Sequence, residues 1–447
     1  MSIWLRNPLA VLADNAEGGI VVDDSGYISE LIPRDGSPET PGVKVFEAKD
    51  HVIIPGLINT HHHFFQTLTR AFPPALDKEL FPWLQALWPV WQYLDGEMVS
   101  AAARLAMAEL LLSGCTTASD HHYIFTPSLS DTVDREVSAA LELGMRGVFS
   151  RGSVDLVEGN DLTPERMIEP EQKILDHTEQ LLKRYHECGS GARIQIAPAP
   201  CTPVAVTRDL MQESASLARR FSAPLHTHLA ETAEEVAIVQ ERHGQRTVSY
   251  LADVGWLAED VWVAHGIHFD DEELYRLGAA GTGVCHCPSS NAILASGSCR
   301  VNELEEAGCS VGLGVDGSAS NDHSNLMQEV RQAFLAQRLR YGAQAVRHRD
   351  ALRWATEGSA ACLGRDDIGR IAPGMQADLA LFRLDEPRFS GYGDPLAALV
   401  TCGAHHADRV MVGGDWVVAD GELVNADLRE IMHRHRDASA RMQNLVR

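Results

Sequence analysis

Two kinds of segment alternate through the middle of the chain. Short runs that are apolar at nearly every position, such as ARIQIAPAP and VWVAHGIHF, are separated by longer segments rich in strong helix formers, such as MVSAAARLAMAELLLSG. Continuous apolar runs are typical of strands that are buried on both faces of a parallel sheet, and helices cover such a sheet. About eight strand-then-helix units follow one another, so residues 58–370 are predicted to form a (β/α)8 barrel.

The two ends of the chain carry a different pattern. Residues 1–57 contain short apolar runs such as GGIVVDD and HVIIPGLIN, and short strands return after residue 371 in GMQADLALFRL and DRVMVGGDWVVADGEL. Glycine and aspartate turns separate these strands, and neither end has enough of them to form a stable sheet domain alone. We therefore expect residues 1–57 and 371–447 to build one small composite β-sandwich domain, which ends in a C-terminal helix.

Composition and charge narrow the class of partner. The chain has 447 residues, of which 45% are hydrophobic, and its net charge is −24. Such an acidic surface repels phosphate backbones and anionic lipid headgroups, so we expect a small-molecule partner rather than nucleic acid or a membrane. The N-terminus lacks a signal-peptide pattern, and the nine cysteines occur without paired CxxC spacing. These features predict a soluble, cytoplasmic protein with reduced thiols.

The chain has 20 histidines, and several stand where apolar runs end. In INTHHHFF, His61 and His63 alternate along an extended backbone, so both side chains point to the same side. Three further runs end in LHTHLAE, VAHGIH and GLGVDG, and they offer His228 with Glu231, His265, and Asp316. Because active-site residues of a (β/α)8 barrel lie at the carboxyl ends of its strands, we expect these side chains to meet at one face.

Two imidazoles from one strand, one from another strand and a carboxylate form a donor set of three nitrogens and one oxygen. Such a set suits one divalent transition metal and leaves positions for water and substrate. Zinc is the expected metal, and ferrous iron remains open. Each motif alone is weak support for a metal site, and the prediction rests on their occurrence in barrel order.

Other histidines are interpreted as structural or left open. His226 is expected to face away from His228 and is not counted as a ligand. His286 lies in a CHC sequence that has no second cysteine pair at zinc-site spacing, so it is assigned to a buried strand. The pair His121 and His122 follows an apolar run and is left open.

In sequence order, these motifs resemble those of the amidohydrolase superfamily. PGLINTHHH resembles its first-strand signature, HLAET its fifth-strand histidine with a glutamate three residues on, AHG its sixth-strand histidine and GLGVDG its eighth-strand aspartate. IGRIAPGMQADLALF resembles the strand by which such enzymes rejoin the β-sandwich, so the similarity covers essentially the whole chain. Two-metal members typically carry a lysine on the fourth strand, and ARIQIAPAP has none. The resemblance therefore implies a single metal.

The resemblance also implies a role for each residue. The metal ligands would be His61, His63, His228 and Asp316. Asp316 would orient a water molecule and accept its proton, and His265 would stabilise charge on the attacking oxygen. Glu231 would protonate a ring nitrogen and then help to expel ammonia, a role that suits a partly buried glutamate because burial raises its pKa. A metal-free scaffold protein is the alternative from another class, and the presence of every ligand disfavours it.

Within the superfamily, the chain is most similar to the aminohydrolases of purines and triazines. Gln66 stands three residues after His63, where guanine-deaminating members resemble it with a glutamine that reads the base; capping of the following helix is its alternative role. Phe81 and Cys201 stand where nucleoside-acting members carry polar residues, and both departures favour a free base. A buried, inert thiol is the alternative for Cys201.

Aromatic residues complete the candidate substrate contacts. Trp83, Trp88 and Trp91 can provide a stacking face, although two of the three are expected to be core residues of a helix. Trp88 is taken as the substrate contact, together with Gln66 and Cys201.

The combination of HHHFFQTLTR, DHHY and APAPCTP is most similar to members that deaminate a free oxidised purine base. The implied reaction converts 8-oxoguanine and water to urate and ammonia. Guanine, isocytosine, a hydroxyatrazine-type s-triazine, and S-adenosylhomocysteine or another nucleoside stay open as substrates. Members of this group often pair or tetramerise, so a homo-oligomer is expected.

Overall fold

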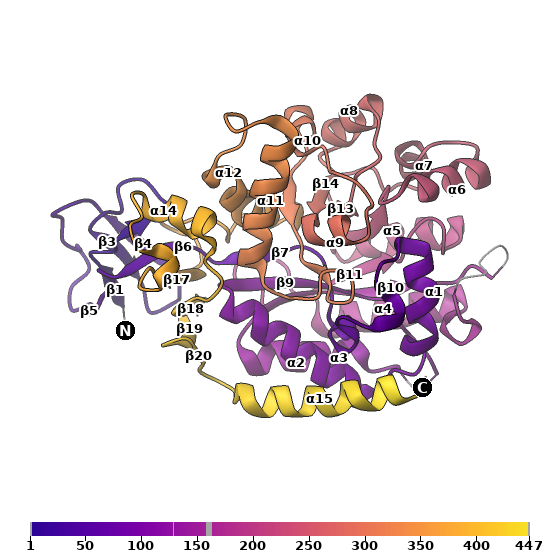
Figure 1. Ribbon diagram of the computed structural model, residues 1–447, viewed down its shortest axis with the longest axis horizontal. Helices are drawn as coiled ribbons and strands as arrows, with labels where there is room; N and C mark the ends of the chain where they lie inside the picture. The colour runs from indigo at the N-terminus through magenta and orange to yellow at the C-terminus, as the bar shows by residue number, and fades with distance from the viewer. Residues whose placement is uncertain (1, 128, 158–162, 446–447) are drawn as a thin grey trace.

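A computed structural model describes residues 2–127, 129–157 and 163–445, and its centre is a sheet of eight parallel strands surrounded by helices (Figure 1). In chain order the strands are β7 (Leu57–Asn59), β9 (Cys115–His122), β10 (Arg146–Ser153), β11 (Ile194–Pro200), β12 (Leu225–Leu229), β13 (Val261–His265), β14 (Gly283–His286) and β15 (Val311–Leu313). Each strand forms a ladder with the next one in this order except β11 with β12, and β15 pairs with β7.

The sheet closes between β11 and β12. The Thr227 hydroxyl donates to the Pro200 carbonyl at 2.8 Å, and the His228 amide donates to the Cys201 carbonyl at 3.2 Å. Both faces of the strands are covered, and every residue of β9 and β10 is buried. The predicted (β/α)8 barrel is therefore confirmed, with the apolar runs as its strands.

Helices follow the strands and cover the outside of the barrel. The longer ones are α1 (Leu80–Trp91), α2 (Gly96–Leu112), α3 (Thr132–Leu143), α4 (Glu171–Tyr185), α5 (Arg208–Arg220), α6 (Ala233–His243), α8 (Asp271–Ala280) and α11 (Leu326–Tyr341). The shorter ones are α7 (Thr247–Asp253), α9 (Pro288–Ile293), α10 (Val301–Ala307), α12 (His348–Arg353), α13 (Ser359–Cys362) and α14 (Pro395–Ala398). Polar side chains fix where several of them begin. Thr207 caps α5, and Asp270 and Glu273 form a capping box on α8.

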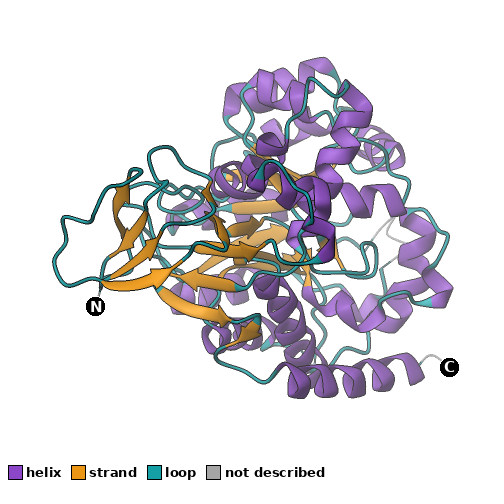
Figure 2. Cartoon of the chain, turned by 60° about the vertical axis from the view of Figure 1, so that its left-hand side comes forward, coloured by secondary structure: helices purple, strands orange, loops and turns teal. Residues whose placement is uncertain are grey.

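Both chain ends contribute to a second, β-rich part beside the barrel (Figure 2). One sheet has the order β4-β3-β1-β5 and the other the order β2-β6-β17-β18-β19-β20. The strands are β1 (Ile3–Arg6), β2 (Ala10–Val11), β3 (Gly19–Val22), β4 (Ile28–Ile32), β5 (Lys44–Glu47), β6 (His51–Pro55), β17 (Leu379–Arg383), β18 (Arg409–Val412), β19 (Asp415–Ala419) and β20 (Glu422–Leu423). Antiparallel pairing of β6 with β17 joins the two ends of the chain. The composite sheet region is confirmed, while its division from the barrel at residues 58 and 370 stays a prediction.

The C-terminal helix α15 (Leu428–Asn444) leaves this β-rich part and runs along α2 of the barrel (Figure 1). Arg441 pairs with Asp95 and Glu97 at the start of α2, and the Ser439 hydroxyl donates to the Leu68 carbonyl. The helix therefore ties the end of the chain to the barrel. In the described part of the chain, no helix is both long and apolar enough to cross a membrane.

Candidate metal centre and substrate pocket

A short parallel pair brings the two ends of the barrel sequence together. β8 (His62–His63) lies beside β16 (Asp316–Gly317), with Asp316 in register with His62. The Oδ1 atom of Asp316 lies 3.3 Å from Nε2 of His61 and 3.3 Å from Nε2 of His63. Nε2 of His63 lies 3.1 Å from Nε2 of His228, at the end of β12. The four side chains that the sequence singled out as ligands thus converge.

The protons of two of these rings are fixed by backbone carbonyls. Nδ1 of His63 donates to the carbonyl of His121 at 2.6 Å, and Nδ1 of His228 donates to the carbonyl of Cys201 at 2.6 Å. Each neutral ring therefore carries its proton on Nδ1 and a lone pair on Nε2. Two lone pairs that face each other across 3.1 Å repel unless a cation or a proton lies between them.

A third histidine fixes the ring of His61. Nδ1 of His226 donates to the Trp262 carbonyl at 2.9 Å, so its Nε2 accepts from Nδ1 of His61 at 2.8 Å. Nε2 of His61 is buried and has no hydrogen-bond partner among the described residues. The expectation that His226 faces away from His228 is wrong, because residues two apart on a strand share a face.

Burial keeps these imidazoles neutral. It lowers the pKa of His61 well below its ordinary value of 6.5 and that of His63 to about 3. For Asp316, burial acts to raise the pKa, but the adjoining His61, followed by His265 and His63, holds it well below its ordinary value. Three neutral imidazole nitrogens and one carboxylate fit a divalent transition metal, because such a cation would satisfy every converging lone pair.

His265 completes this face of the site at the end of β13. The Asn291 side chain donates to its Nδ1 at 3.0 Å, so Nε2 carries a proton. That nitrogen lies 3.5 Å from Oε2 of Glu231 and 3.9 Å from Oδ2 of Asp316. His265 and Asp316 have positive φ angles of 75° and 61°, a strained backbone that aims both side chains inward from strand ends.

Glu231 follows β12 and is 5% exposed. Burial raises its pKa well above the ordinary value, and the charges of Asp316 and Glu235 raise it further. The carboxyl group therefore keeps its proton at a higher pH than an exposed glutamate does, and it can act as an acid beside the histidine cluster.

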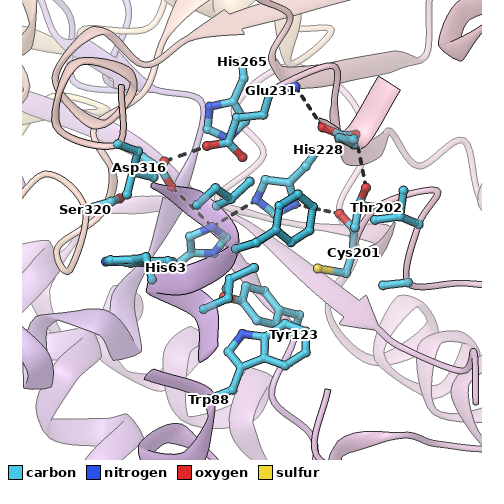
Figure 3. A pocket seen from close by; sticks show the side chains of 18 of the residues that line it. His63, Trp88, Tyr123, Cys201, Thr202, His228, Glu231, His265, Asp316 and Ser320 are labelled. Carbon is cyan, nitrogen blue, oxygen red and sulfur yellow. Dashed lines mark hydrogen bonds and ion pairs between the residues drawn. The ribbon is translucent and has the colours of Figure 1, made fainter. Parts of the chain in front are cut away.

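These side chains open onto a cavity of about 150 Å³ (Figure 3). His63, His228, Glu231, His265 and Asp316 line one side, and Trp88 and Tyr123 lie at the opposite end (Figure 3). Much of the remaining wall is apolar. The three candidate substrate contacts, Gln66, Cys201 and Trp88, all lie in the lining, and their contact with a substrate stays a prediction.

Two tryptophans, not one, face the cavity. Trp83 lies in the lining as well as Trp88, although Nε1 of Trp83 donates to the Ala319 carbonyl at 2.9 Å. Trp91 is fully buried, and its Nε1 donates to the Thr69 hydroxyl at 3.1 Å. Trp83 is therefore both a buried core residue and part of the pocket wall, because α1 forms one side of the pocket.

Among the lining residues that sequence reasoning missed, Tyr123 and Glu235 lie next to groups that it named. The hydroxyl of Tyr123 faces Gln66 and Trp88, and its ring lies 5.1 Å from that of His63. The available signal was the Tyr after His121 and His122 in DHHY, since it continues the strand that carries them. Glu235 had no motif of its own, and only the fold shows its position.

Three other buried histidines contact the site or the barrel wall. His121 stacks on His228 with ring centroids 4.7 Å apart, and its carbonyl holds His63. His122 lies beside Glu136 of α3, with Nδ1 and Oε1 3.2 Å apart. His286 is buried on β14, as expected, with its Nε2 3.0 Å from the amide nitrogen of Gln337.

Comparison with known proteins gives consistent matches along nearly the whole chain. The sequence profile of the amidohydrolase family matches residues 52–417. The chain is 54% identical to 8-oxoguanine deaminase from Pseudomonas aeruginosa over 441 residues, which cover 98% of each chain. It is 35% identical to isoxanthopterin deaminase from an unknown prokaryotic organism, over 92% of this chain and 89% of that protein. The solved structure of atrazine chlorohydrolase TrzN from Arthrobacter aurescens TC1, complexed with zinc, matches with a TM-score of 0.91 and 28% identity over 98% of this chain and 100% of that chain.

Proposed function

The chain belongs to the amidohydrolase family and is a metal-dependent hydrolase, and we propose that it deaminates a free oxidised purine base. The proposed reaction converts 8-oxoguanine and water to urate and ammonia. The observation that carries it is the 54% identity, over 98% of both chains, to an 8-oxoguanine deaminase. The converging histidines, the buried Glu231 with its raised pKa and the small aromatic pocket supply the chemistry that this reaction needs.

The metal would be held by His61, His63, His228 and Asp316. Zinc is the proposed native ion, because three imidazoles and a carboxylate suit it and a similar structure carries zinc; ferrous iron is the alternative. When bound, the cation supplies Lewis acidity that activates water as a nucleophile near neutral pH. Metal analysis of the purified protein tests this assignment, with about one equivalent expected for a one-metal site.

The chain's own groups would move the protons. Asp316, ionised because its pKa is held low, accepts a proton from water as the oxygen attacks C2 of the purine. The Nε2–H of His265, 3.9 Å from Asp316, donates to the attacking oxygen and stabilises charge on it. Glu231 gives its proton to the adjacent ring nitrogen, which keeps it in urate. Asp316 passes the proton from water to the amino group, the C2–N bond breaks, and ammonia leaves. The hydroxyl on C2 becomes the carbonyl as its proton goes to Glu231, which restores both carboxyl groups.

The shape of the pocket supports a free base. The cavity of about 150 Å³ is lined by Phe81 and Cys201, the residues that stand where nucleoside-acting relatives carry polar groups. Gln66 can both donate and accept, which fits a purine edge that presents a carbonyl beside an N–H. Trp88 offers an indole face and a donor at the same end of the pocket.

A panel of amines tests the substrate. Release of ammonia is measured for 8-oxoguanine, guanine, isocytosine, isoxanthopterin and S-adenosylhomocysteine, release of the alkylamine is measured for hydroxyatrazine, and urate is followed directly for 8-oxoguanine. We expect the highest kcat/KM for 8-oxoguanine. A preference for S-adenosylhomocysteine would contradict the free-base assignment. A preference for hydroxyatrazine would identify the enzyme as a triazine hydrolase instead.

Two further properties are proposed for the enzyme. We place its action in the cytoplasm, which is supported by nine free cysteines, among them Cys285 and Cys287 with their sulfur atoms 3.7 Å apart. We also propose a homo-oligomer, on the basis of the family resemblance. Cell fractionation tests the first property, and light scattering of the purified protein tests the second.

A further inference from the structure

A second buried glutamate stands directly behind the proposed acid. Glu235 lies in the first turn of α6 and is 3% exposed. Its carboxylate turns back onto the link between β12 and α6. Oε2 accepts from the amide of Glu231 at 2.8 Å, and Oε1 accepts from the amide of Ala230 at 3.2 Å and the hydroxyl of Thr202 at 3.3 Å. Figure 3 marks the bonds that leave Glu231 and Thr202.

The link that Glu235 holds is strained. Ala230 has a φ angle of 52°, in the left-handed region that a residue with a Cβ atom rarely adopts. This turn is what takes the chain out of β12 and points Glu231 into the cavity. Backbone strain of this kind persists only where surrounding contacts hold it. The hydrogen bonds from the Ala230 and Glu231 N–H groups to the Glu235 carboxylate are such contacts.

The side chain of Glu231 itself is held only loosely. Its Oε1 lies 3.5 Å from the Ser296 hydroxyl, and its Oε2 lies 3.5 Å from Nε2 of His265. Both distances are at the long end for a hydrogen bond. The position of the Glu231 carboxyl therefore depends on its backbone, and the backbone depends on Glu235.

Burial disfavours the charged form of Glu235, and hydrogen bonds to the carboxylate oppose this effect. Desolvation raises its pKa, while the amides of Glu231 and Ala230 and the hydroxyl of Thr202 act to lower it. Both oxygens are engaged by N–H donors. A glutamine in the same place has one accepting oxygen and one NH₂ group, so it cannot hold both amides.

We propose that Glu235 is a positioning residue that holds the Ala230–Glu231 backbone so that the Glu231 carboxyl reaches the substrate ring. This inference rests on the proposed function of Glu231 as the acid. Glu235 acts through Glu231 and takes no proton from the substrate itself.

The test begins with Glu235→Gln. Its NH₂ group faces the Glu231 amide if the oxygen keeps the bond to Ala230, and this donor–donor contact displaces Glu231. Because a misplacement of about 1 Å can cost on the order of 100-fold in rate, we expect kcat to fall about 10- to 100-fold. KM and metal content are expected to stay close to wild type. Glu234→Gln is the matched control, since it removes the same charge from an exposed position in the same turn and is expected to leave kcat unchanged.

A double-mutant cycle separates positioning from a general structural effect. If Glu235 acts through Glu231, then Glu235→Gln added to Glu231→Gln causes no further loss of kcat. Full additivity of the two losses overturns the proposal. A rise in KM with unchanged kcat also overturns it, because that result makes Glu235 a substrate-binding group. If the glutamine variant does not fold, Glu235→Asp replaces it, and the same fall in kcat with unchanged KM is expected because the shorter side chain cannot reach both amides.

Failure of the proposed function is recognised separately. Wild-type activity on the substrate panel is measured first, and the double-mutant cycle is then run on the substrate that is hydrolysed fastest. Hydrogen exchange of the segment 229–233 provides a readout without substrate: Glu235→Gln is expected to speed exchange there, while Glu234→Gln does not. Unchanged exchange and unchanged kcat in the glutamine variant overturn the inference whatever the substrate is.

Discussion

At the level of single residues, the acid is the most direct test of the chemistry. Glu231→Gln keeps the shape of the side chain but removes the proton that the mechanism needs. We expect kcat/KM for 8-oxoguanine to fall about 100-fold or more, the usual worth of general acid catalysis. Steady-state ammonia release measures the change, with bound metal determined in parallel. Near-normal turnover by the variant would assign the proton transfer to another group.

A substitution of His226 tests whether its hydrogen bond to His61 orients that proposed metal ligand. His226→Phe keeps a ring against Trp262, whose centroid is 4.3 Å away, but removes the acceptor for Nδ1 of His61. Loss of such a partner typically costs about 10- to 100-fold in metal affinity. Competition with a chelator measures the affinity, and His433→Phe on the exposed face of α15 is the control. Equal affinity in the variant and the wild type would mean that His61 needs no orientation by His226.

Trp88 tests the far end of the pocket. Its Nε1 and the Oε1 of Gln66 are buried, and in the part of the chain that the structure describes neither makes a hydrogen bond of normal geometry, although the Tyr123 hydroxyl lies beside both side chains. A ligand can therefore offer each of them a better partner. Trp88→Phe keeps an aromatic wall and removes the donor. We expect KM to rise about 10-fold, the worth of about 1.4 kcal/mol, with little change in stability.

Trp83→Phe is the contrasting variant, because Nε1 of Trp83 is already bonded to the Ala319 carbonyl. Its removal is expected to lower stability by about 1 kcal/mol, measured by denaturant unfolding. If Trp88→Phe lowers stability and leaves KM unchanged, Trp88 is a wall residue and not a substrate contact.

At the level of elements, the apolar runs predicted the barrel strands because a strand buried on both faces has no polar alternation. The converging side chains were predictable for a related reason, since His63, His228 and Asp316 directly follow or end such runs. Hydrogen-bond partners were not predictable. Nothing in the sequence shows that the carbonyls of His121 and Cys201 fix the tautomers of His63 and His228, because those contacts depend on how neighbouring strands are placed.

The joint between barrel and β-rich part depends on a buried ion pair. Arg146 begins β10, and its guanidinium donates two bonds to Asp378, at 2.8 and 3.0 Å, just before β17. Asp378→Asn leaves the Arg146 charge buried without its counter-charge, and we expect a loss of about 3–5 kcal/mol in the free energy of unfolding. Denaturant unfolding measures it.

The matched control for this pair lies nearby on the surface. Asp415 is exposed and lies 3.7 Å from Arg193, so Asp415→Asn is expected to change the free energy of unfolding by less than about 1 kcal/mol. Similar small effects of both substitutions would show that the sheets and the barrel are held together without the buried pair.

At the level of the whole molecule, buried titratable groups make stability depend on pH in two opposite ways. The folded pKa of His286 is lowered by burial to about 3, below its ordinary value of 6.5, so unfolding takes up a proton between these values. The folded pKa of Glu329 is raised by burial to about 7, above its ordinary value of 4.5, so unfolding releases a proton between these values. Stability contributed by His286 is present above pH 6.5 and is lost as the pH falls, whereas the penalty from Glu329 grows as the pH rises toward 7.

The contribution of His286 to the pH dependence of stability can be measured separately in metal-free protein. One such group changes the free energy of unfolding by at most about 1.4 kcal/mol per pH unit, so His286→Gln is expected to flatten the decline between pH 6 and pH 4 by about that slope. Denaturant unfolding at several pH values measures it, with the exposed His433→Gln as the control that leaves the slope unchanged. Because Gln at 286 can still meet Gln337, a loss of stability that is equal at every pH indicates lost packing, while stability relative to the wild type that rises as the pH falls from 6 to 4 indicates the titration. Only the second result supports the assignment of a neutral, buried imidazole at this position.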